Sequence, residues 1–351
     1  MHHQDSSLKR RLRCTRWRVQ AGNYLVGLCI VVLSSLTPTV HMLAAGPHAP
    51  HPDDMTANEI DSSSRPGNAS RADVYRIGVG MADVTGPAAE VNMMGYARFG
   101  QDTGGIHTRL YARTFVIEDE VGSRIVYVSC DIGMIDQSVK TQVAKTLTEK
   151  YGGLYGHENV LISGTHTHSG PGGFLQYLLY TIVSQGFTKQ TFDAVVNGIV
   201  LSVDRAHANL TPGRIYFNEG QLVDASINRS PTAYLNNSEE ERKRYEHDTD
   251  KDMYLLKFVS MTGQPLGVVT WFAVHPTSMN NTNTLISGDN KGLASLMFER
   301  KLNGPDYLPG KGPFIAAFRL VTFSCIHTLR CCGLPLELGF HPFQWVASCF
   351  P

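Results

Sequence analysis

The densest group of potential ligands is a His-x-His pair in a glycine-rich loop. Residues 163–173 read Ser-Gly-Thr-His-Thr-His-Ser-Gly-Pro-Gly-Gly, which places His166 and His168 two residues apart. Residues at i and i+2 of an extended chain project to the same side, so we expect both imidazoles to reach one space. Neutral imidazole is a good zinc ligand, and such a pair often begins a zinc site. The alternative is two polar histidines in a solvated loop.

His275 is the candidate for a third imidazole. It follows the apolar run 268–274, and Pro276 ends the strand that this run predicts. The end of a buried strand is where α/β proteins place site residues, although a lone histidine there is more often structural. Two or three histidines leave a zinc site incomplete, so another ligand must come from elsewhere.

Three further features rank lower. Arg229 lies in the turn-like sequence Asn-Arg-Ser-Pro and is either a clamp for an oxygen-rich group or a solvated arginine. Asp131 follows a predicted strand; a carboxylate ligand is one interpretation, and a helix- or turn-capping role is favoured. Residues 287–290, Ser-Gly-Asp-Asn, indicate a turn and a helix N-cap. The sequence holds no GxSxG elbow, P-loop, HExxH or dinucleotide fingerprint.

The elements that must position these residues form a mixed α/β pattern. Short runs rich in β-branched and aromatic residues predict strands at 75–85, 113–118, 124–130, 159–163, 214–218, 253–259 and 266–274. Helical spacing of apolar residues predicts helices over 139–151 and 192–203, with a third at 291–301. Strands alternating with helices favour an α/β fold of mixed sheets flanked by helices.

Composition and charge exclude several classes of protein. Apolar residues make up 42% of the chain and charged residues 18%, which excludes a wholly disordered, collagen-like or coiled-coil protein. The 31 basic residues balance 31 acidic ones, but residues 1–20 hold six of the basic and one of the acidic, leaving 25 against 30 elsewhere. This is no electrostatic footprint for nucleic acid, and we expect no nucleic-acid partner.

The N-terminal residues 1–45 predict entry to the secretory pathway. The basic block precedes an apolar run at 24–36 with a weaker stretch to residue 45, which is typical of a cleaved signal peptide. It is also long enough to suggest a signal anchor, and a core helix after a basic tail is the third interpretation. We therefore expect a secreted protein, or a type II plasma-membrane protein with its main part lumenal or extracellular.

Two segments flank the predicted domain at 73–318. Residues 46–72 are rich in Pro, His, Ser and Asp and predict a linker or stalk, with an N-glycosylation sequon at Asn68 and others further along at Asn209, Asn236 and Asn280. Only Cys130 of the seven cysteines lies between residues 46 and 318, whereas residues 319–351 hold four. This break in composition predicts an unrelated, unstructured tail at 319–351.

Residues 75–318 resemble the neutral ceramidases, zinc-dependent amidases that split ceramide into sphingosine and fatty acid. The resemblance begins with Tyr-Arg-Ile-Gly-Val-Gly-Met-Ala-Asp-Val-Thr-Gly-Pro at 75–87 and Asn-Met-Met-Gly-Tyr-Ala at 92–97. It continues through Gly-Ile-His-Thr-Arg-Leu-Tyr-Ala-Arg at 105–113, Cys-Asp-Ile-Gly-Met at 130–134 and the His-x-His loop. The Asn-Arg-Ser-Pro sequence, residues 271–277 and Ser-Gly-Asp-Asn-Lys-Gly at 287–292 complete it. So many ordered blocks are far more specific than any single motif.

The resemblance implies a role for each candidate. His166 and His275 match zinc-ligating histidines, His168 matches a histidine beside the substrate and the metal-bound water, and Arg229 matches an arginine near the substrate. The family completes its zinc site with a glutamate and a tyrosine much further along the chain. Its reactive serine lies in a Gly-Asp-Val-Ser-Pro-Asn segment, and it carries a C-terminal immunoglobulin-like β-sandwich.

After Phe318 the sequence departs from the family. It holds no Gly-Asp-Val-Ser-Pro-Asn segment, and the later ligands and the β-sandwich have no counterpart. We interpret the chain as the N-terminal portion of such an enzyme, ending in an alternative splice product or a gene-model error. We expect little or no activity from it. The alternatives are a catalytically dead lipid-binding or regulatory isoform, and a zinc hydrolase of another substrate class.

Overall fold

The computed structural model describes residues 74–320. The predicted signal or anchor, the linker and nearly all of the predicted tail lie outside these residues. The strands, in chain order, are β1 (Tyr75–Asp83), β2 (Ala89–Met94), β3 (Asp102–Ile106), β4 (Tyr111–Glu118), β5 (Arg124–Cys130), β6 (Val160–Gly164), β7 (Gly170–Pro171), β8 (Thr211–Gln221), β9 (Asp252–Ser260), β10 (Pro265–Phe272), β11 (Leu285–Ile286) and β12 (Ile315–Arg319). The helices are α2 (Gln137–Tyr151), α3 (Leu178–Val183), α4 (Lys189–Ala208), the 3-10 turn η3 (Val223–Ala225), α5 (Pro231–Leu235), α6 (Glu239–Arg242) and α7 (Asp289–Asn303).

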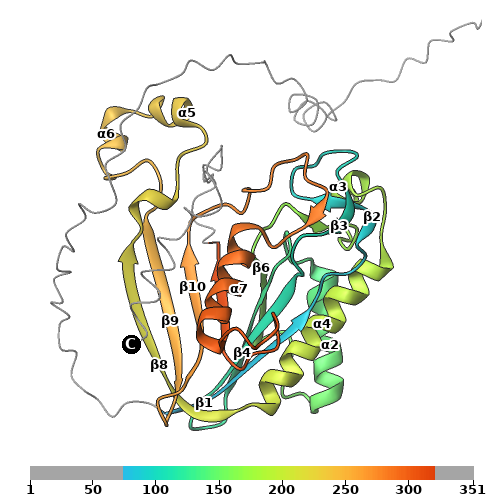
Figure 1. Cartoon of the computed structure of the whole chain (residues 1–351), viewed down its shortest axis with the longest axis vertical. Coiled ribbons are helices and arrows are strands. Elements are labelled where there is room, and N and C mark those ends of the chain that lie inside the picture. The colour runs from blue at the N-terminus through green and yellow to red at the C-terminus, as the bar shows by residue number, and fades with distance from the viewer. Residues whose placement is uncertain (1–73, 321–351) are drawn as a thin grey trace, which may run out of the picture. The chain divides into compact units, whose positions relative to one another are not determined.

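Eight strands form one mixed sheet in the order β12-β10-β9-β8-β1-β4-β5-β6 (Figure 1). The pairs β5–β6 and β10–β12 are parallel and the other neighbours antiparallel. Because β5 and β6 are parallel, their C-terminal ends lie at the same end of the sheet, and the loops that follow them start there. The His-x-His loop follows β6 and therefore begins at this end.

The eight-stranded sheet curves until its two halves pack against each other. Phe115 of β4 stacks on Phe258 of β9 with ring centroids 5.0 Å apart, and both belong to a buried cluster that also draws on β1, β10 and β12. At the far edges, the Arg319 guanidinium of β12 donates to the Ser163 and Gly164 carbonyls of β6, at 3.0 and 3.2 Å. The curvature thus brings the strand ends that precede His166 and His275 toward one another.

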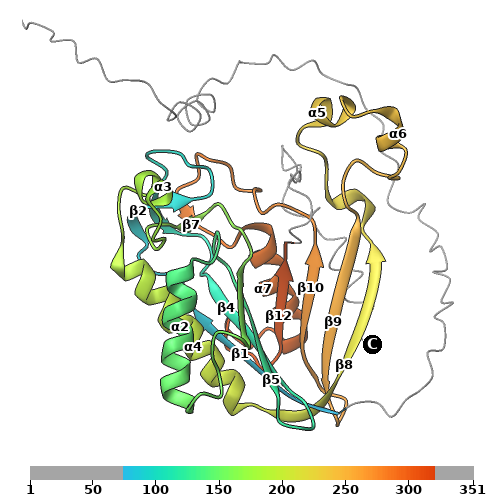
Figure 2. The same cartoon turned by 180° about the vertical axis from the view of Figure 1, so that it is seen from behind.

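Helices cover the sheet on two sides. Helices α2 and α4 lie side by side over β1, β4 and β5 (Figure 2), and their apolar faces join one large buried cluster. Helix α7 packs on β12, where Phe298 lies between Phe314 and Phe318. No helix among residues 74–320 combines the length and the apolar character that a membrane span requires.

A second, four-stranded sheet of order β11-β3-β2-β7 holds the loops of the site together. Strand β7 continues the His-x-His loop and pairs with β2. Strand β11 lies just before α7 and pairs with β3. Three segments far apart in the sequence are thereby fixed beside one another.

The predicted α/β fold of mixed sheets flanked by helices is confirmed. The predicted strands and helices all exist, and β5 has the predicted bounds 124–130. The second sheet was not predicted, because its strands are two to six residues long and β3 is glycine-rich. Strand β12 was also missed, and it extends one residue beyond the predicted boundary at Phe318 to Arg319, which is only 6% exposed.

Candidate metal centre

The His-x-His loop is bonded to the end of β5. The Thr165 amide donates to the Cys130 carbonyl at 2.7 Å, and the His166 amide donates to the Ile132 carbonyl at 3.0 Å. His166 has a φ of +74°, a left-handed conformation that is uncommon for a residue with a side chain and occurs often at functional sites. The backbone after β6 thus stays hydrogen-bonded to the end of β5 and the segment after it through Thr165 and His166, and it turns sharply at His166.

The tautomer of His166 follows from its main-chain contact. Its Nδ1 lies 2.6 Å from the Gly133 carbonyl oxygen. Because a carbonyl can only accept, Nδ1 carries a proton and donates to it, and Nε2 faces the other histidines. Such a hydrogen bond to the far ring nitrogen is the usual way in which proteins orient a metal-ligating histidine.

Three imidazoles converge at this point. The Nε2 atom of His168 lies 3.3 Å from Nε2 of His166 and 2.9 Å from Nε2 of His275. Ligand atoms of the three residues all fall within 4.8 Å of one another, and this is the one group of three or more potential metal ligands within residues 74–320. The Nδ1 of His168 is buried and has no hydrogen-bond partner among those residues.

These distances suit a shared metal ion. Two nitrogens that each lie about 2.0–2.1 Å from a tetrahedral zinc ion are roughly 3.3 Å apart. An imidazole donor set suits zinc and also copper, iron and nickel. The ligand atoms of His166 and His275 also lie within 4.8 Å of each other, so both can reach one ion beside His168, and the residues present fit the zinc ion that the sequence predicts.

The electrostatics favour a neutral His168 ring. Burial, followed by the neighbouring His166, His275 and Arg229 in that order of importance, lowers the pKa of His168 to about 3. The ring is therefore neutral at physiological pH, which is the form that binds a metal or accepts a proton.

Gly95 and Tyr96 support His168 from behind. A Cβ atom on Gly95, whose φ is +127°, would lie 2.3 Å from Cγ of His168, so only glycine allows the ring this position. The ring of Tyr96 meets that of His168 edge-on at 4.6 Å, and its hydroxyl donates to the Met279 carbonyl at 2.7 Å. Burial, together with Asp289, raises the pKa of Tyr96 to about 12 despite Arg229. Sequence reasoning assigned neither residue a role, although both lie in the resembling block at 92–97.

The loop after His275 is held by the start of α7. The Asp289 carboxylate accepts from the backbone amides of Ser278 and Met279 at 3.0 and 2.8 Å, and the side-chain Nδ2 of Asn290 donates to the His275 carbonyl at 3.2 Å. The predicted turn and N-cap at 287–290 are confirmed, since the N-cap is Gly288, and α7 begins at Asp289, two residues before the predicted start at 291. The Asp289 side chain holds the His275 loop.

Arg229 lies at the rim of the histidine cluster. Its side chain is exposed, and it is near enough to lower the pKa of both His168 and Tyr96. The turn that presents it is shaped by buried Asn228, whose side-chain oxygen accepts from the Ser230 amide at 2.8 Å. The structure therefore places all four predicted site residues in one region.

Asp131 is a partner in a buried ion network and does not belong to the group of potential metal ligands, so neither the predicted capping role nor the role of a carboxylate ligand applies to it. Its Oδ2 binds Nη1 of Arg113 at 2.7 Å and accepts from the Tyr111 amide at 3.2 Å. Nε of Arg113 binds Glu299 of α7, also at 2.7 Å. Burial opposes the charge of Arg113, but the two carboxylates outweigh it and raise its pKa. The network joins β4, the end of β5 and α7 beneath the histidine cluster.

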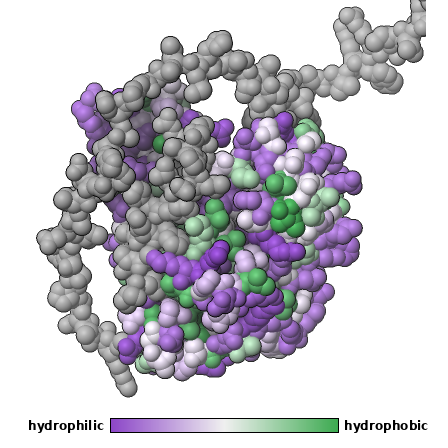
Figure 3. Space-filling model, viewed as in Figure 1, coloured by the Kyte–Doolittle hydropathy of each residue, from purple (hydrophilic) through white to green (hydrophobic). Residues whose placement is uncertain are grey.

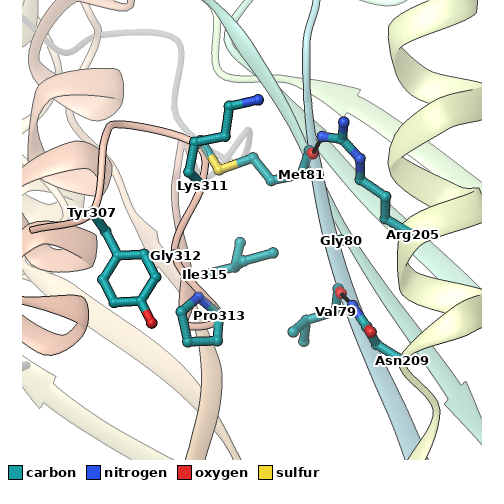
Figure 4. Close-up of a pocket in the computed structure, with 11 residues that line it drawn as sticks. Val79, Gly80, Met81, Arg205, Asn209, Tyr307, Lys311, Gly312, Pro313 and Ile315 are labelled. Carbon is teal, nitrogen blue, oxygen red and sulfur yellow. Dashed lines mark hydrogen bonds between the residues drawn. The ribbon is translucent and has the colours of Figure 1, made fainter.

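A cleft of about 420 Å³ lies elsewhere, between β1, α4 and the loop before β12 (Figure 4). Arg205 and Asn209 point from α4 and its end to the Met81 and Val79 carbonyls of β1, so neither side chain is directed into the cleft. None of the predicted site residues lines it.

Three imidazoles gathered at the strand ends of a curved α/β sheet make up a candidate metal centre. Residues 75–323 match the family model described as neutral/alkaline non-lysosomal ceramidase, N-terminal. The chain belongs to this family, which confirms the resemblance seen in the sequence.

Named relatives agree with this assignment. The chain is 52% identical over 244 residues to a neutral ceramidase of Drosophila pseudoobscura pseudoobscura and 54% identical over 245 residues to neutral ceramidase A of Dictyostelium discoideum; each match covers 70% of this chain and 34% of the relative. The crystal structure of neutral ceramidase from Pseudomonas aeruginosa superposes with a TM-score of 0.69 at 44% identity, covering 78% of this chain and 42% of that one. The chain thus spans about a third of the length of the curated relatives.

Proposed function

We propose that this chain carries the histidine-bearing part of a zinc-dependent amidase that hydrolyses the N-acyl bond of ceramide to sphingosine and fatty acid. The convergence of the three Nε2 atoms of His166, His168 and His275 carries the proposal. Family membership supports the substrate, since the relatives are named for ceramide cleavage.

Each residue has a distinct part in this proposal. His166 and His275 hold the zinc ion, with His166 fixed by its bond to Gly133. A zinc ion there supplies Lewis-acid polarisation of the amide carbonyl. His168, neutral because it is buried among the other rings, accepts a proton from the attacking water and returns it to the leaving amine. Arg229, exposed at the rim, binds polar oxygens of the substrate.

Metal binding gives the first test. Calorimetric titration of the metal-free full chain with zinc should show about one site, and His166→Ala or His275→Ala should weaken binding by roughly a hundredfold or more. His157→Ala is the matched control, because His157 is exposed and lies outside the cluster. Equal zinc affinity in all variants would remove the basis of the proposal.

Hydrolysis gives the second test. The sequence-based prediction is that the chain on its own turns over little or no ceramide, even when loaded with zinc. Robust turnover that a chelator abolishes would contradict that prediction and support the amidase. Ceramide binding by a folded chain without turnover would favour the lipid-binding alternative, and cleavage of non-lipid amides or phosphoesters would favour another substrate class.

The N-terminal predictions remain open to experiment. Secretory entry and membrane attachment rest on residues 1–45, outside the described part of the chain. Expression in cells with a C-terminal tag, followed by fractionation and glycosidase treatment, would distinguish a secreted from an anchored product.

A further inference from the structure

The segment that follows the His-x-His loop protrudes from the molecule. The Thr188 amide donates to the Gly173 carbonyl at 2.7 Å, which closes the base of a compact surface loop. Phe174 and Leu175, at its start, are 0% and 3% exposed and hold it in the core. From Gln176 to Thr188 no side chain is buried, and helix α3 contributes none to the core. We call residues 176–187 the α3 loop.

The exposed surface of the α3 loop is apolar. Its exposed side chains are Tyr177 (51%), Leu178 (75%), Leu179 (65%), Tyr180 (37%), Ile182 (55%) and Phe187 (53%). No Asp, Glu, Lys or Arg occurs anywhere between residues 159 and 188. Single exposed apolar residues are ordinary, but a contiguous uncharged group of this kind marks an interaction surface.

The loop is continuous with the metal centre. Its base lies five residues after His168, and the intervening strand β7 pairs with the end of β2, where Met94 lies opposite Gly170. The next residues after β2 are Gly95 and Tyr96, which contact His168. Helix α3 lies at the same end of the molecule as β2 and β3 in both views (Figures 1 and 2). On the face shown in Figure 3, apolar side chains interrupt a mostly hydrophilic surface at this end.

We propose that the α3 loop docks into the interfacial region of a lipid bilayer and so holds the histidine cluster beside the membrane. Leucine, isoleucine and phenylalanine gain from burial in the acyl boundary, and tyrosine rings with their hydroxyls suit the headgroup level. The hydroxyl of Tyr177 donates to Gln137 at 2.6 Å, so this ring bridges the apolar loop and the polar surface of α2. The inference deepens the proposed function, since ceramide is a membrane lipid, but docking itself requires no metal.

The charge pattern fixes the kind of membrane contact. Because the loop carries no formal charge, its docking should need no anionic lipid and should not weaken as salt rises. A basic surface held by electrostatics would behave in the opposite way.

A local probe tests the docking in the full chain, independently of any binding by residues 1–45. Leu179→Trp places a fluorophore on the loop, and Val121→Trp is the matched control, because Val121 is 85% exposed and lies in the β4–β5 turn, at the opposite end of β5 from the histidines. Both are measured by difference from the parent chain, which has three tryptophans. The vesicles are phosphatidylcholine, plain or brominated on the acyl chains.

We expect brominated lipid to quench the added emission of Leu179→Trp roughly twofold at low and high salt, because the side chain would lie about 5–10 Å into the headgroup and acyl boundary. The Val121→Trp emission should not change. Absence of quenching at residue 179, or equal quenching at both positions, would overturn the proposal.

A charged double variant separates the remaining outcomes. The double variant Leu178→Glu, Leu179→Glu should leave zinc affinity unchanged. When the same two substitutions are made in a chain that carries Ile182→Trp, they should abolish the quenching of the tryptophan at residue 182 by brominated lipid. If the parent chain instead forms dimers that this double variant dissociates, and Leu179→Trp is not quenched, the loop binds a second copy and membrane docking is excluded. In the chain with the unaltered loop, absence of docking with intact zinc binding would refute this inference alone, whereas docking without zinc binding would refute only the metal site.

Discussion

Two adjoining stretches of the chain, the His-x-His loop and the α3 loop, differ in almost every structural respect. From Thr165 to Gly173 every residue except His166 is buried, and the amides of Thr165, His166 and Gly172 all donate to carbonyls of other segments. In the α3 loop no side chain is buried, and most backbone bonds stay within the loop or at its base.

The difference matches the two purposes that we propose for this continuous uncharged sequence. A metal centre needs ligand atoms fixed within fractions of an ångström, and that requires contacts from several segments. A surface that enters a fluid lipid phase needs only apolar area and a firm base. The rigid stretch should therefore be sensitive to distant substitutions, and the exposed one insensitive even to drastic ones.

The largest effect should come from the buried ion network beneath the histidines. Arg113→Met leaves Asp131 and Glu299 buried without their shared cation, which should lower the free energy of unfolding by about 3–5 kcal/mol. Arg109→Met is the control, because its pair with Asp83 is 58% and 38% exposed and should contribute no more than about 1 kcal/mol. Urea unfolding of both variants measures the difference, and similar midpoints would show that the network does not stabilise the site.

A smaller effect is expected where the chain passes behind His168. Gly95→Ala adds a Cβ atom that clashes with the imidazole and also strains the backbone at φ +127°, which together should cost about 2–4 kcal/mol and weaken zinc binding. Gly100→Ala, at φ +78° with no atom within 4 Å of the added Cβ, carries only the backbone strain of about 1 kcal/mol. Thermal unfolding and zinc titration of the pair separate the two causes. If the two variants behave alike, His168 is not held tightly against Gly95.

Buried Lys291, near the strand end that precedes His275, should make the free energy of unfolding depend on pH. Lys291 is 5% exposed, and its Nζ donates to the Phe272 carbonyl at 2.9 Å, at the end of β10 and three residues before His275. Burial, and then the charge of Arg319, lower its pKa to about 7. Between pH 7 and about 10 the unfolded lysine keeps a proton that the folded one has lost, so the unfolded state binds more protons and stability rises with pH.

The slope from this lysine is at most about 1.4 kcal/mol per pH unit. Lys291→Met removes it, so the difference in unfolding free energy between parent and variant should change steadily from pH 7 to pH 9. Denaturant unfolding at three pH values measures this. A constant difference would mean that Lys291 stays protonated in the folded protein.

The sequence predicted the histidines of the candidate site better than the residues that hold them in place. The spacing of His166 and His168 and the strand end before His275 are local features that made the three rings candidates for one site, and the resemblance to the family then assigned each of them a role. The contact of Gly95 with His168 and the pairing of Asp131 with Arg113 join residues whose separation no periodicity reveals. Asp131 was misread because its position after a strand suggests a cap, whereas its partner lies on another strand.

The exposure of the α3 loop was not predicted, because its local sequence resembles that of a buried segment. An apolar run such as Leu-Leu-Tyr-Thr-Ile-Val at 178–183 has the composition of a core segment, and composition cannot show that nothing covers it. Only the closed base at Gly173 and Thr188 and the exposure of the side chains reveal that it protrudes. The simplest test of the difference between the two loops is therefore whether the side chains of the α3 loop are exposed in solution.

The smallest effect should come from the α3 loop itself. Leu178→Glu combined with Leu179→Glu introduces two charges into an apolar run, a change that would unfold a typical core segment. Here both side chains are already mostly in water, so the free energy of unfolding should change by no more than about 0.5 kcal/mol. Leu147→Glu on α2 is the control, because Leu147 is 0% exposed within the cluster shared with α4, and it should prevent folding. Circular dichroism with urea unfolding compares the variants, and a large loss of stability in the double variant would show that the α3 loop is packed in solution, which would remove the distinction between the two stretches.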